Sequence, residues 1–273
     1  MKFSKVYAAY FSATGTTEKI VTAIADEIAA KLSLPVEKFD FTLPAARKEP
    51  KEFEADSLVV FGTPVIAGRV PNVLLKYLAT ISSNGAVAVP VVLFGNRNFD
   101  DALIELRDIL ETAGMKTVAG GAFIGEHSFS KILAANRPDA ADIAIAVDFA
   151  DKIAEKVSAI EAVTEPIAVE GVEKPYRGYY QPRDRKGEPV NILKVKPLTN
   201  DKCNNCGICA AVCPMGSINP ENVREFTGIC MKCGACVKKC PNGAKYYEDA
   251  GYLYHQHELE EGYARRAEPS LFI

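Results

Sequence analysis

The eight cysteines of this chain form two copies of one short pattern. Each copy reads C-x2-C-x2-C-x3-C and is followed by a proline; the first begins at Cys203 and the second at Cys230. Every cysteine of the first copy recurs 27 positions later, and so do two of its glycines. The segment is an internal duplication, so we expect it to fold as a small unit with pseudo-two-fold symmetry.

The spacing of these cysteines suits a cubane iron–sulfur cluster. Such a cluster needs four thiolates from different directions, and cysteines at i, i+3 and i+6 of a tight loop supply three of them. The fourth cysteine, at i+10, does not reach the same cluster, and in this kind of run it binds the other one. We therefore predict two [4Fe–4S] clusters with crossed ligation. The predicted ligand sets are Cys203, Cys206, Cys209 and Cys240 for one cluster, and Cys230, Cys233, Cys236 and Cys213 for the other.

Zinc sites and disulfides are the alternatives for so many cysteines. Zinc ribbons use two C-x2-C pairs separated by a longer loop, whereas here a third cysteine follows each pair at the same short spacing. Disulfides are typical of secreted proteins, and the N-terminus does not read as a signal peptide. The segment from about Lys196 to Glu248 resembles bacterial-type two-[4Fe–4S] ferredoxins, which implies transfer of single electrons at low potential.

The composition is ordinary for a globular protein. The chain has 273 residues, of which 48% are hydrophobic and 25% charged, and its net charge is −3. This charge gives no reason to expect a nucleic-acid partner. No run of about 18 apolar residues is present, so no membrane span is expected. Without a signal peptide, the protein is expected in the cytoplasm.

The first part of the chain contains no cysteine and alternates between strand and helix patterns. Apolar residues at helical spacing, such as Ile20, Ile24 and Ile28, predict helices between short apolar strands. This alternation favours an α/β fold with a parallel, doubly wound sheet and helices on both faces. The predicted strands cover 6–11, 34–39, 57–62, 87–94 and 115–124, and the predicted helices cover 17–32, 70–81, 100–113 and 138–157.

A turn rich in Ser and Thr joins the first predicted strand to the first helix. A helix N-terminus carries free N–H groups and a partial positive charge, so a phosphate binds there without a lysine or arginine. A plain helix cap is the alternative. The turn lacks a P-loop ending and a G-x-G-x-x-G fingerprint, which argues against those nucleotide sites. Its residues are Ser12, Ala13, Thr14, Gly15, Thr16 and Thr17.

Two further turns follow the third and fourth predicted strands. In a doubly wound sheet such turns gather at the carboxyl edge, where ligands bind. We therefore predict that they contribute to the same site. The second turn supplies Thr63, Pro64, Val65, Ile66, Ala67 and Gly68, and the third supplies Gly95, Asn96, Arg97, Phe99 and Asp100.

With these turns, residues 1 to about 158 resemble a flavodoxin, because the S-x-T-G-x-T phosphate loop is matched in full. The resemblance implies a five-stranded sheet in the order 2-1-3-4-5, with FMN at its carboxyl edge. Flavodoxins often sandwich the flavin ring between Trp and Tyr, but this chain has no Trp, and its turns offer Ile66 and Phe99. The whole chain resembles the flavodoxin–ferredoxin fusions found in anaerobes.

The chain has three histidines. His127, in a loop that also resembles this family, is expected to face the flavin or the ferredoxin domain, or to be a hydrogen-bonded loop histidine. His255 and His257 lie in an acidic tail and are expected to be solvated. Tyrosines of a proline-rich connector are expected to lie against the first domain. The predicted division is a flavodoxin-like domain at 1–158, an extended connector at 159–197, a small α+β ferredoxin domain at 198–250 and a tail at 251–273.

The function expected from these features is electron transfer among two [4Fe–4S] clusters, FMN and redox partner proteins, with no nucleic acid or membrane involved. No catalytic residue is assigned. Two alternatives stay open. One is a flavin-dependent reductase of a small substrate, with His127, Arg69 and Arg97 as candidate groups. The other is a ferredoxin subunit whose first domain has lost FMN.

Overall fold

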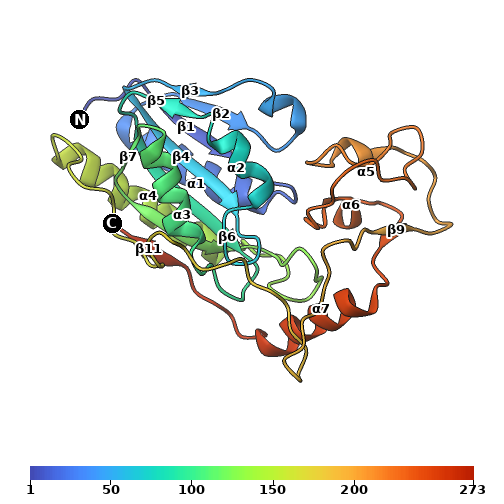
Figure 1. Ribbon diagram of the computed structural model, residues 1–273. Coiled ribbons are helices and arrows are strands. Elements are labelled where there is room, and N and C mark those ends of the chain that lie inside the picture. Colours follow the sequence, from blue (N-terminus) through green and yellow to red (C-terminus); the bar gives the residue numbers. More distant parts are fainter.

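A central parallel sheet organises the first part of the chain (Figure 1). The computed structural model describes all residues from 1 to 273. The parallel strands are β1 (Lys5–Tyr10), β2 (Val36–Asp40), β4 (Ser57–Pro64), β6 (Val87–Phe94) and β8 (Gly120–Ile124). They lie side by side in the order β2-β1-β4-β6-β8, so the predicted flavodoxin-like order 2-1-3-4-5 is confirmed.

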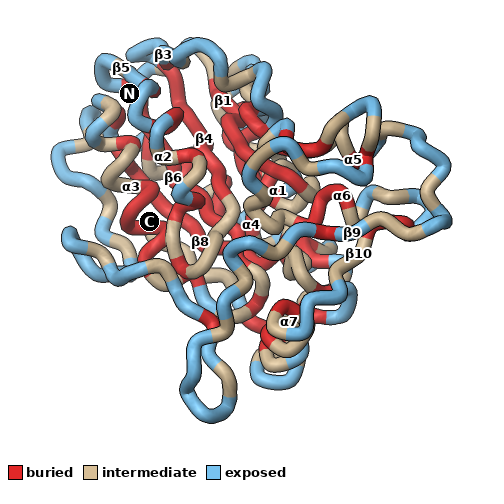
Figure 2. Tube along the Cα trace, turned by 45° about the vertical axis from the view of Figure 1, so that its right-hand side comes forward, coloured by how far each residue is buried: buried red, intermediate tan, exposed pale blue.

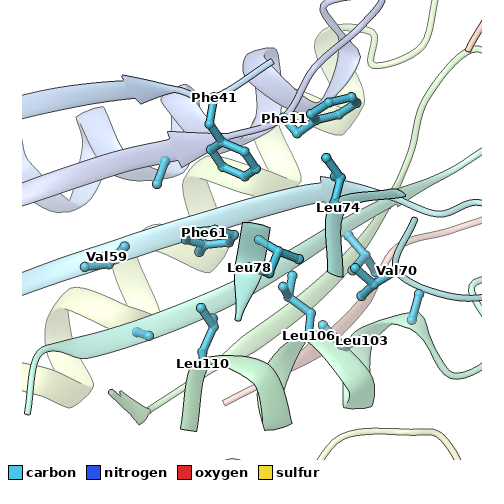
Figure 3. Close-up of a cluster of buried hydrophobic side chains, with 14 of the residues drawn as sticks. Phe11, Phe41, Val59, Phe61, Val70, Leu74, Leu78, Leu103, Leu106 and Leu110 are labelled. Atoms are coloured by element: carbon cyan, nitrogen blue, oxygen red, sulfur yellow. The ribbon is translucent and has the colours of Figure 1, made fainter. Parts of the chain in front are cut away.

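Helices cover both faces of this sheet, as the alternating patterns predicted. One face carries α1 (Thr16–Leu32) and α4 (Ala140–Ala159), and the other carries α2 (Asn72–Leu78) and α3 (Ala102–Thr112). Figure 3 shows leucines of α2 and α3 in one cluster with Phe41 and Phe61, whose ring centres are 5.1 Å apart. Each such side chain contributes about 1.5–3 kcal/mol by burial. These two cores therefore hold the turns at the carboxyl edge in place.

The fifth predicted strand, 115–124, is interrupted. β7 (Lys116–Thr117) ends opposite Ala88 of β6, and β8 pairs again from Val91 onward. Three residues separate Thr117 from Gly121, whereas two residues separate their partners Ala88 and Val91 on β6. Pro90 lies in this stretch of β6 and has no N–H to donate, so the ladder cannot continue there.

The C-terminal segment returns to the first domain. α7 (Ala250–Gly262) is followed by β11 (Ser270–Phe272), which pairs antiparallel with β8 at the edge of the sheet. An uncovered edge strand is open to pairing with other chains, and β11 covers this one. The prediction that His255 is solvated is wrong, because only 7% of it is exposed, whereas His257 is exposed.

The segment with the cysteines, residues 198–246, folds as a small α+β unit that we call the cysteine unit. Its elements are β9 (Leu198–Thr199), α5 (Ile208–Ala211), α6 (Ala235–Lys238) and β10 (Lys245–Tyr246). Lys245 pairs with Thr199, and Ile218 pairs with Phe226 at the positions that the 27-residue offset makes equivalent, so each pair joins the two halves. The glycines that precede α5 and α6 have φ of 75° and 73°. The duplication in the sequence is thus repeated in the backbone.

The connector has no helix or strand and runs along the first domain (yellow in Figure 1). The Asp101 carboxylate accepts hydrogen bonds from the N–H groups of Val172 and Arg177, at 2.9 and 2.8 Å. The Tyr176 hydroxyl donates to Asp108 at 2.6 Å. These contacts hold the connector against the domain, as its tyrosines indicated.

Burial follows this layered arrangement. Figure 2 shows buried residues along the central strands and the inward sides of the helices, with exposed residues in the connector and the outer loops of the cysteine unit. None of the helices combines the length and the apolar character needed to cross a membrane. The shorter elements are a 3-10 helix (Pro44–Arg47), β3 (Glu52–Phe53) and β5 (Ser82–Ser83).

Candidate functional site

Two small cavities in the cysteine unit are each lined by four thiols. In each cavity three cysteines come from one run and the fourth comes from the other run. One cavity is lined by Cys203, Cys206, Cys209 and Cys240, and the other by Cys213, Cys230, Cys233 and Cys236. The structure thus brings together the same sets of four that the spacing predicts.

Backbone N–H groups point at equivalent sulfurs in the two halves. The Ser217 N–H donates to Cys213 Sγ at 3.4 Å, and the Ala244 N–H donates to Cys240 Sγ at 3.2 Å. Donors of this kind stabilise the negative charge of a reduced cluster. Both cavities therefore offer the same chemical setting.

The state of the thiols also fits a cofactor with strong positive charge. Burial raises the pKa of the Cys233 thiol to about 12 and raises the pKa of Cys236 as well. Metal ligation requires thiolates, so a bound iron–sulfur cluster would stabilise them in these buried positions. No group of three or more His, Cys, Asp or Glu side chains is arranged to hold a single metal ion. The residues fit two [4Fe–4S] clusters, which would supply one-electron transfer when bound.

A cavity of about 80 Å³, the phosphate cavity, lies at the turn between β1 and α1. Gly15 precedes α1 with φ of 92°, a conformation that glycine adopts readily. A Cβ at Gly15 would meet nothing within 4 Å, so open space lies beside the helix N-terminus. Ser12 Oγ accepts a hydrogen bond from the Glu18 N–H at 3.0 Å and fixes the turn. The predicted residues that line this cavity are Ala13, Thr14, Thr16, Thr17, Pro64, Val65, Ile66 and Gly95.

A larger cavity of about 670 Å³, the ring cavity, adjoins the phosphate cavity. Its volume is in the range of about 300–1,000 Å³ that is usual for pockets binding organic ligands. Fifteen of its 29 lining residues are hydrophobic. Together the two cavities fit FMN: the phosphate cavity lies at a helix N-terminus, and the ring cavity is wide and largely apolar. The predicted residues that line the ring cavity are Val65, Ile66, Ala67, Gly68, Gly95 and Arg97, and the two cavities share Val65, Ile66, Phe94, Gly95, His127, Ser128 and Met231.

Asn96 and Phe99, predicted to bind the cofactor, line neither cavity. The Asn96 amide donates to the backbone carbonyls of Tyr263 and Arg265, both at 2.6 Å, so the C-terminal tail occupies it. Phe99 packs in the core against Phe94, with 5.7 Å between ring centres. The side chains of Asn96 and Phe99 are therefore engaged in contacts with other parts of the protein.

Four other predicted residues also lie outside the lining. Ser12 and Gly15 shape the phosphate turn from within. Thr63 is fully buried, and its hydroxyl has no hydrogen-bond partner. Asp100 forms an ion pair with Arg97. We assign these four residues to the support of the site and not to contact with the ligand.

His127 lines both cavities and therefore lies at their junction. Its Nδ1 accepts a hydrogen bond from the Phe129 N–H at 3.1 Å, which places the hydrogen of the neutral ring on Nε2. Burial, together with the nearby Lys238 ammonium, lowers the pKa of His127 to about 3. The ring is thus a neutral N–H donor at pH 7, beside the site proposed for FMN.

Several residues that close the ring cavity were missed by sequence reasoning. Tyr179 and Tyr180 of the connector, Met231 of the cysteine unit and His255 of α7 all line it. The Tyr180 N–H donates to the Ala67 carbonyl at 2.8 Å, so this aromatic ring is held at the second turn. The tyrosines in the connector indicated that it packs against the first domain, but they did not indicate which surface of that domain they contact. Met231, between two ligand cysteines, gave no signal.

Lys238 of α6 joins the cysteine unit to the first domain. Its ammonium donates to the carbonyls of His127 and Ser130, at 2.7 and 3.0 Å, and pairs with the Glu126 carboxylate. At Gly234, a Cβ would lie 2.4 Å from a carbonyl oxygen of the first domain, so the two backbones touch. These contacts fix the position of the cysteine cavities relative to the ring cavity.

Lys238→Met is expected to lower the free energy of unfolding by about 1.5–3 kcal/mol, the usual contribution of hydrogen bonds to a charged group. Lys239→Met is the matched control, because it removes the same charge from the next residue, which is exposed; we expect it to change stability by less than about 0.5 kcal/mol. Guanidinium unfolding of anaerobically purified protein measures both. Equal effects of the two variants would contradict the role of Lys238 in joining the domains.

The comparisons with known proteins concern two different parts of the chain. Residues 202–245 match the family model described as "4Fe-4S dicluster domain". No curated protein matches the chain. Among solved structures, a flavodoxin from the domain Archaea has 17% sequence identity and a TM-score of 0.39, covering 56% of this chain and 99% of that one.

Two further solved flavodoxins are similar. Flavodoxin 2 from Bacillus cereus has 18% identity and a TM-score of 0.40, covering 56% of this chain and 99% of its own. The flavodoxin of Streptococcus pneumoniae TIGR4 has 21% identity and a TM-score of 0.37, covering 56% and 97%. The strand order itself defines the fold of the first domain. The chain thus joins an α/β domain with the flavodoxin-like strand order to a segment that matches a 4Fe-4S dicluster domain.

Proposed function

We propose that the protein is an electron carrier in which two [4Fe–4S] clusters deliver electrons to an FMN in the same chain. The inner cluster is the one assigned to Cys213, Cys230, Cys233 and Cys236, and the outer cluster is the one assigned to Cys203, Cys206, Cys209 and Cys240. One observation carries the proposal: Met231 lines the inner-cluster cavity, the phosphate cavity and the ring cavity. The proposed donor and acceptor are therefore neighbours across a single side chain.

The outer cluster is proposed as the point of electron entry. Its cavity shares no lining residue with the phosphate cavity or the ring cavity. Cys206 of the outer cluster is exposed, whereas each of the four inner-cluster cysteines is buried or half-buried. A redox partner protein is therefore expected to dock beside Cys206. The proposed order is partner protein, outer cluster, inner cluster and FMN.

The protein's own residues bind and position the cofactors. The N-terminus of α1, with Thr14 and Thr16, would hold the phosphate of FMN. Lys238 holds the inner cluster beside the ring cavity. FMN accepts one or two electrons, so it links one-electron clusters to two-electron acceptors. Fusion in one chain raises the effective concentration of each module for the other.

Anaerobically purified protein is expected to contain iron for both clusters and one FMN per chain. After stopped-flow mixing with dithionite, bleaching of the clusters should precede reduction of the flavin. The rate of flavin reduction should be independent of protein concentration, because the transfer is intramolecular. A rate that rises with protein concentration, or reduced clusters that never pass electrons to the flavin, would refute the proposal. If the iron is intact but no FMN is bound, the protein is a ferredoxin whose first domain serves only as a scaffold.

A flavin-dependent reductase of a small molecule is the second candidate. The connector, the cysteine unit and α7 add walls to the ring cavity beyond those of the sheet edge. Such walls deepen the site, so a small molecule fits beside the flavin where a protein partner does not. Turnover with a small acceptor, and none with protein acceptors, would favour this candidate.

A further inference from the structure

The outer walls of the ring cavity come from residues that a flavodoxin-like domain alone does not supply. They are Tyr179–Pro182 and Pro189–Leu193 of the connector, Ile229–Lys232 of the cysteine unit, and His255 and Leu259 of α7. Hydrogen bonds fix the first of these walls, because the Tyr179 hydroxyl donates to the Val70 carbonyl and the Tyr180 N–H donates to the Ala67 carbonyl, both at 2.8 Å. Segments outside the sheet edge thus build part of the wall of the ring cavity.

The basic and acidic residues in the lining of the ring cavity are all of one kind, the basic kind. Its lining includes Arg97 and Lys232 but no Asp or Glu. Asp100 pairs with Arg97, yet Asp100 itself does not line the cavity. A cavity lined by positive groups without carboxylates favours an anionic ligand.

Arg97 has unused donors at this wall. Its guanidinium lies over the Tyr180 ring, 4.5 Å from the ring centre, and only 17% of the side chain is exposed. Asp100 accepts from one of its nitrogens. A guanidinium has five N–H donors in a planar fork that matches a carboxylate. The donors that Asp100 does not use have no hydrogen-bond partner in the protein.

His255 is a second donor on the same wall. Its ring stacks on Tyr180 with 6.0 Å between ring centres and 28° between planes, and only 7% of the residue is exposed. The contacts of the ring within the protein are aromatic ones, with Tyr180 and Phe129, and the residue lines the cavity. Burial and the charge of Arg97 lower its pKa, so the neutral ring presents one N–H at pH 7. Arg97 and His255 thus both contact Tyr180, and both line the same wall of the cavity.

Neither Arg97 nor His255 lines the phosphate cavity, so their donors lie away from the end assigned to the phosphate. We propose that the ring cavity binds, beside the flavin, a small organic carboxylate whose anionic group is held by Arg97 and His255. The apolar part of the lining accommodates the organic body. This inference rests on FMN binding and gives the second candidate function a substrate class.

The test is a titration of the FMN-loaded holoprotein with benzoate and with benzamide, its neutral analogue of the same shape. Calorimetry and the difference spectrum of the flavin report binding. Benzoate is expected to bind at least about tenfold more tightly than benzamide. Arg97→Gln should remove this preference, while Arg97→Lys should retain part of it. His255→Phe keeps the stacking on Tyr180 and should weaken benzoate binding about tenfold by loss of the N–H donor.

Arg265→Gln is the matched control, because Arg265 is exposed and does not line the cavity; it should leave the benzoate preference unchanged. FMN content is measured first for every variant. Protein that holds FMN and transfers electrons to it, but binds benzoate no better than benzamide, would overturn this inference and leave the proposed carrier function intact. Protein without FMN would overturn the carrier function and this inference together.

Discussion

Cys213→Ala is expected to destroy the inner cluster and to spare the outer cluster, although Cys213 belongs to the first cysteine run. Cys213 lines the cavity of Cys230, Cys233 and Cys236 and not the cavity of its own run. The variant should lose half of the iron. It should also lose the fast phase of flavin reduction, because the inner cluster is the one that adjoins the FMN site through Met231.

Cys240→Ala is the matched comparison, since it removes the equivalent cysteine of the duplication. This variant should also lose half of the iron, but here the outer cluster is lost and the fast phase of flavin reduction persists. If each run instead bound its own cluster, Cys213→Ala would destroy the outer cluster and Cys240→Ala would destroy the inner cluster. Iron analysis, electron paramagnetic resonance and anaerobic stopped-flow on both variants therefore decide between crossed and uncrossed ligation. Far-UV circular dichroism confirms that both variants are folded.

The features predicted correctly from the sequence depend on residues close together in the chain. The apolar spacing of Ile20, Ile24 and Ile28 specifies a helix face, and all three residues are buried in the core below α1. The cysteine spacing specifies a tight loop and its repeat. Strand order came from a resemblance, and the order in the structure agrees with it. Local patterns and short turns fix these parts of the fold.

The features that sequence reasoning missed depend on contacts between distant residues. Asn96 follows a strand at the ligand edge, so it was assigned to FMN, but its amide binds backbone carbonyls of the tail, beginning at Tyr263. β11 has only three residues, too few for an alternating pattern, and it forms because β8 offers a free edge. His255 is buried because Tyr180 of the connector covers it. None of these partners is recognisable from the residues beside them in the sequence.

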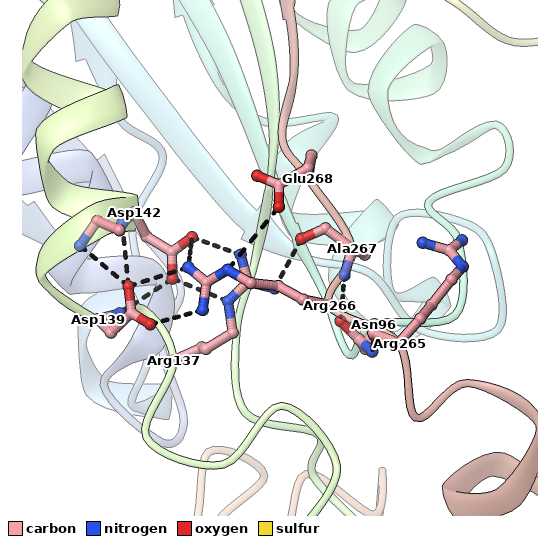
Figure 4. Close-up of polar contacts among 9 residues, drawn as sticks. Asn96, Arg137, Asp139, Asp142, Arg265, Arg266, Ala267 and Glu268 are labelled. Atoms are coloured by element: carbon pink, nitrogen blue, oxygen red, sulfur yellow. Dashed lines mark hydrogen bonds and ion pairs between the residues drawn. The ribbon is translucent and has the colours of Figure 1, made fainter.

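Arg137 is a further example of such a long-range contact, and Figure 4 shows its surroundings. Its side chain is 4% exposed and that of Asp142 is fully buried, and two of its nitrogens bind the two Asp142 oxygens. A third nitrogen donates to the Ala267 carbonyl at 2.7 Å, which ties the tail to the sheet edge. Arg266 reaches the same carboxylate at 3.4 Å from the surface, with 44% of its side chain exposed.

Arg137→Met is expected to lower the free energy of unfolding by about 3–5 kcal/mol, because removing one partner of a buried ion pair leaves the other charge buried without compensation. Arg266→Met removes the same charge from an exposed partner of the same carboxylate, so we expect a loss of less than about 1 kcal/mol. Guanidinium unfolding followed by circular dichroism measures both. Hydrogen exchange should also rise at β11 in the Arg137 variant, because the bond to the Ala267 carbonyl is lost. Similar unfolding midpoints for the two variants would show that burial does not distinguish these arginines, and protected β11 amides in Arg137→Met would show that the tail is held by its strand pairing alone.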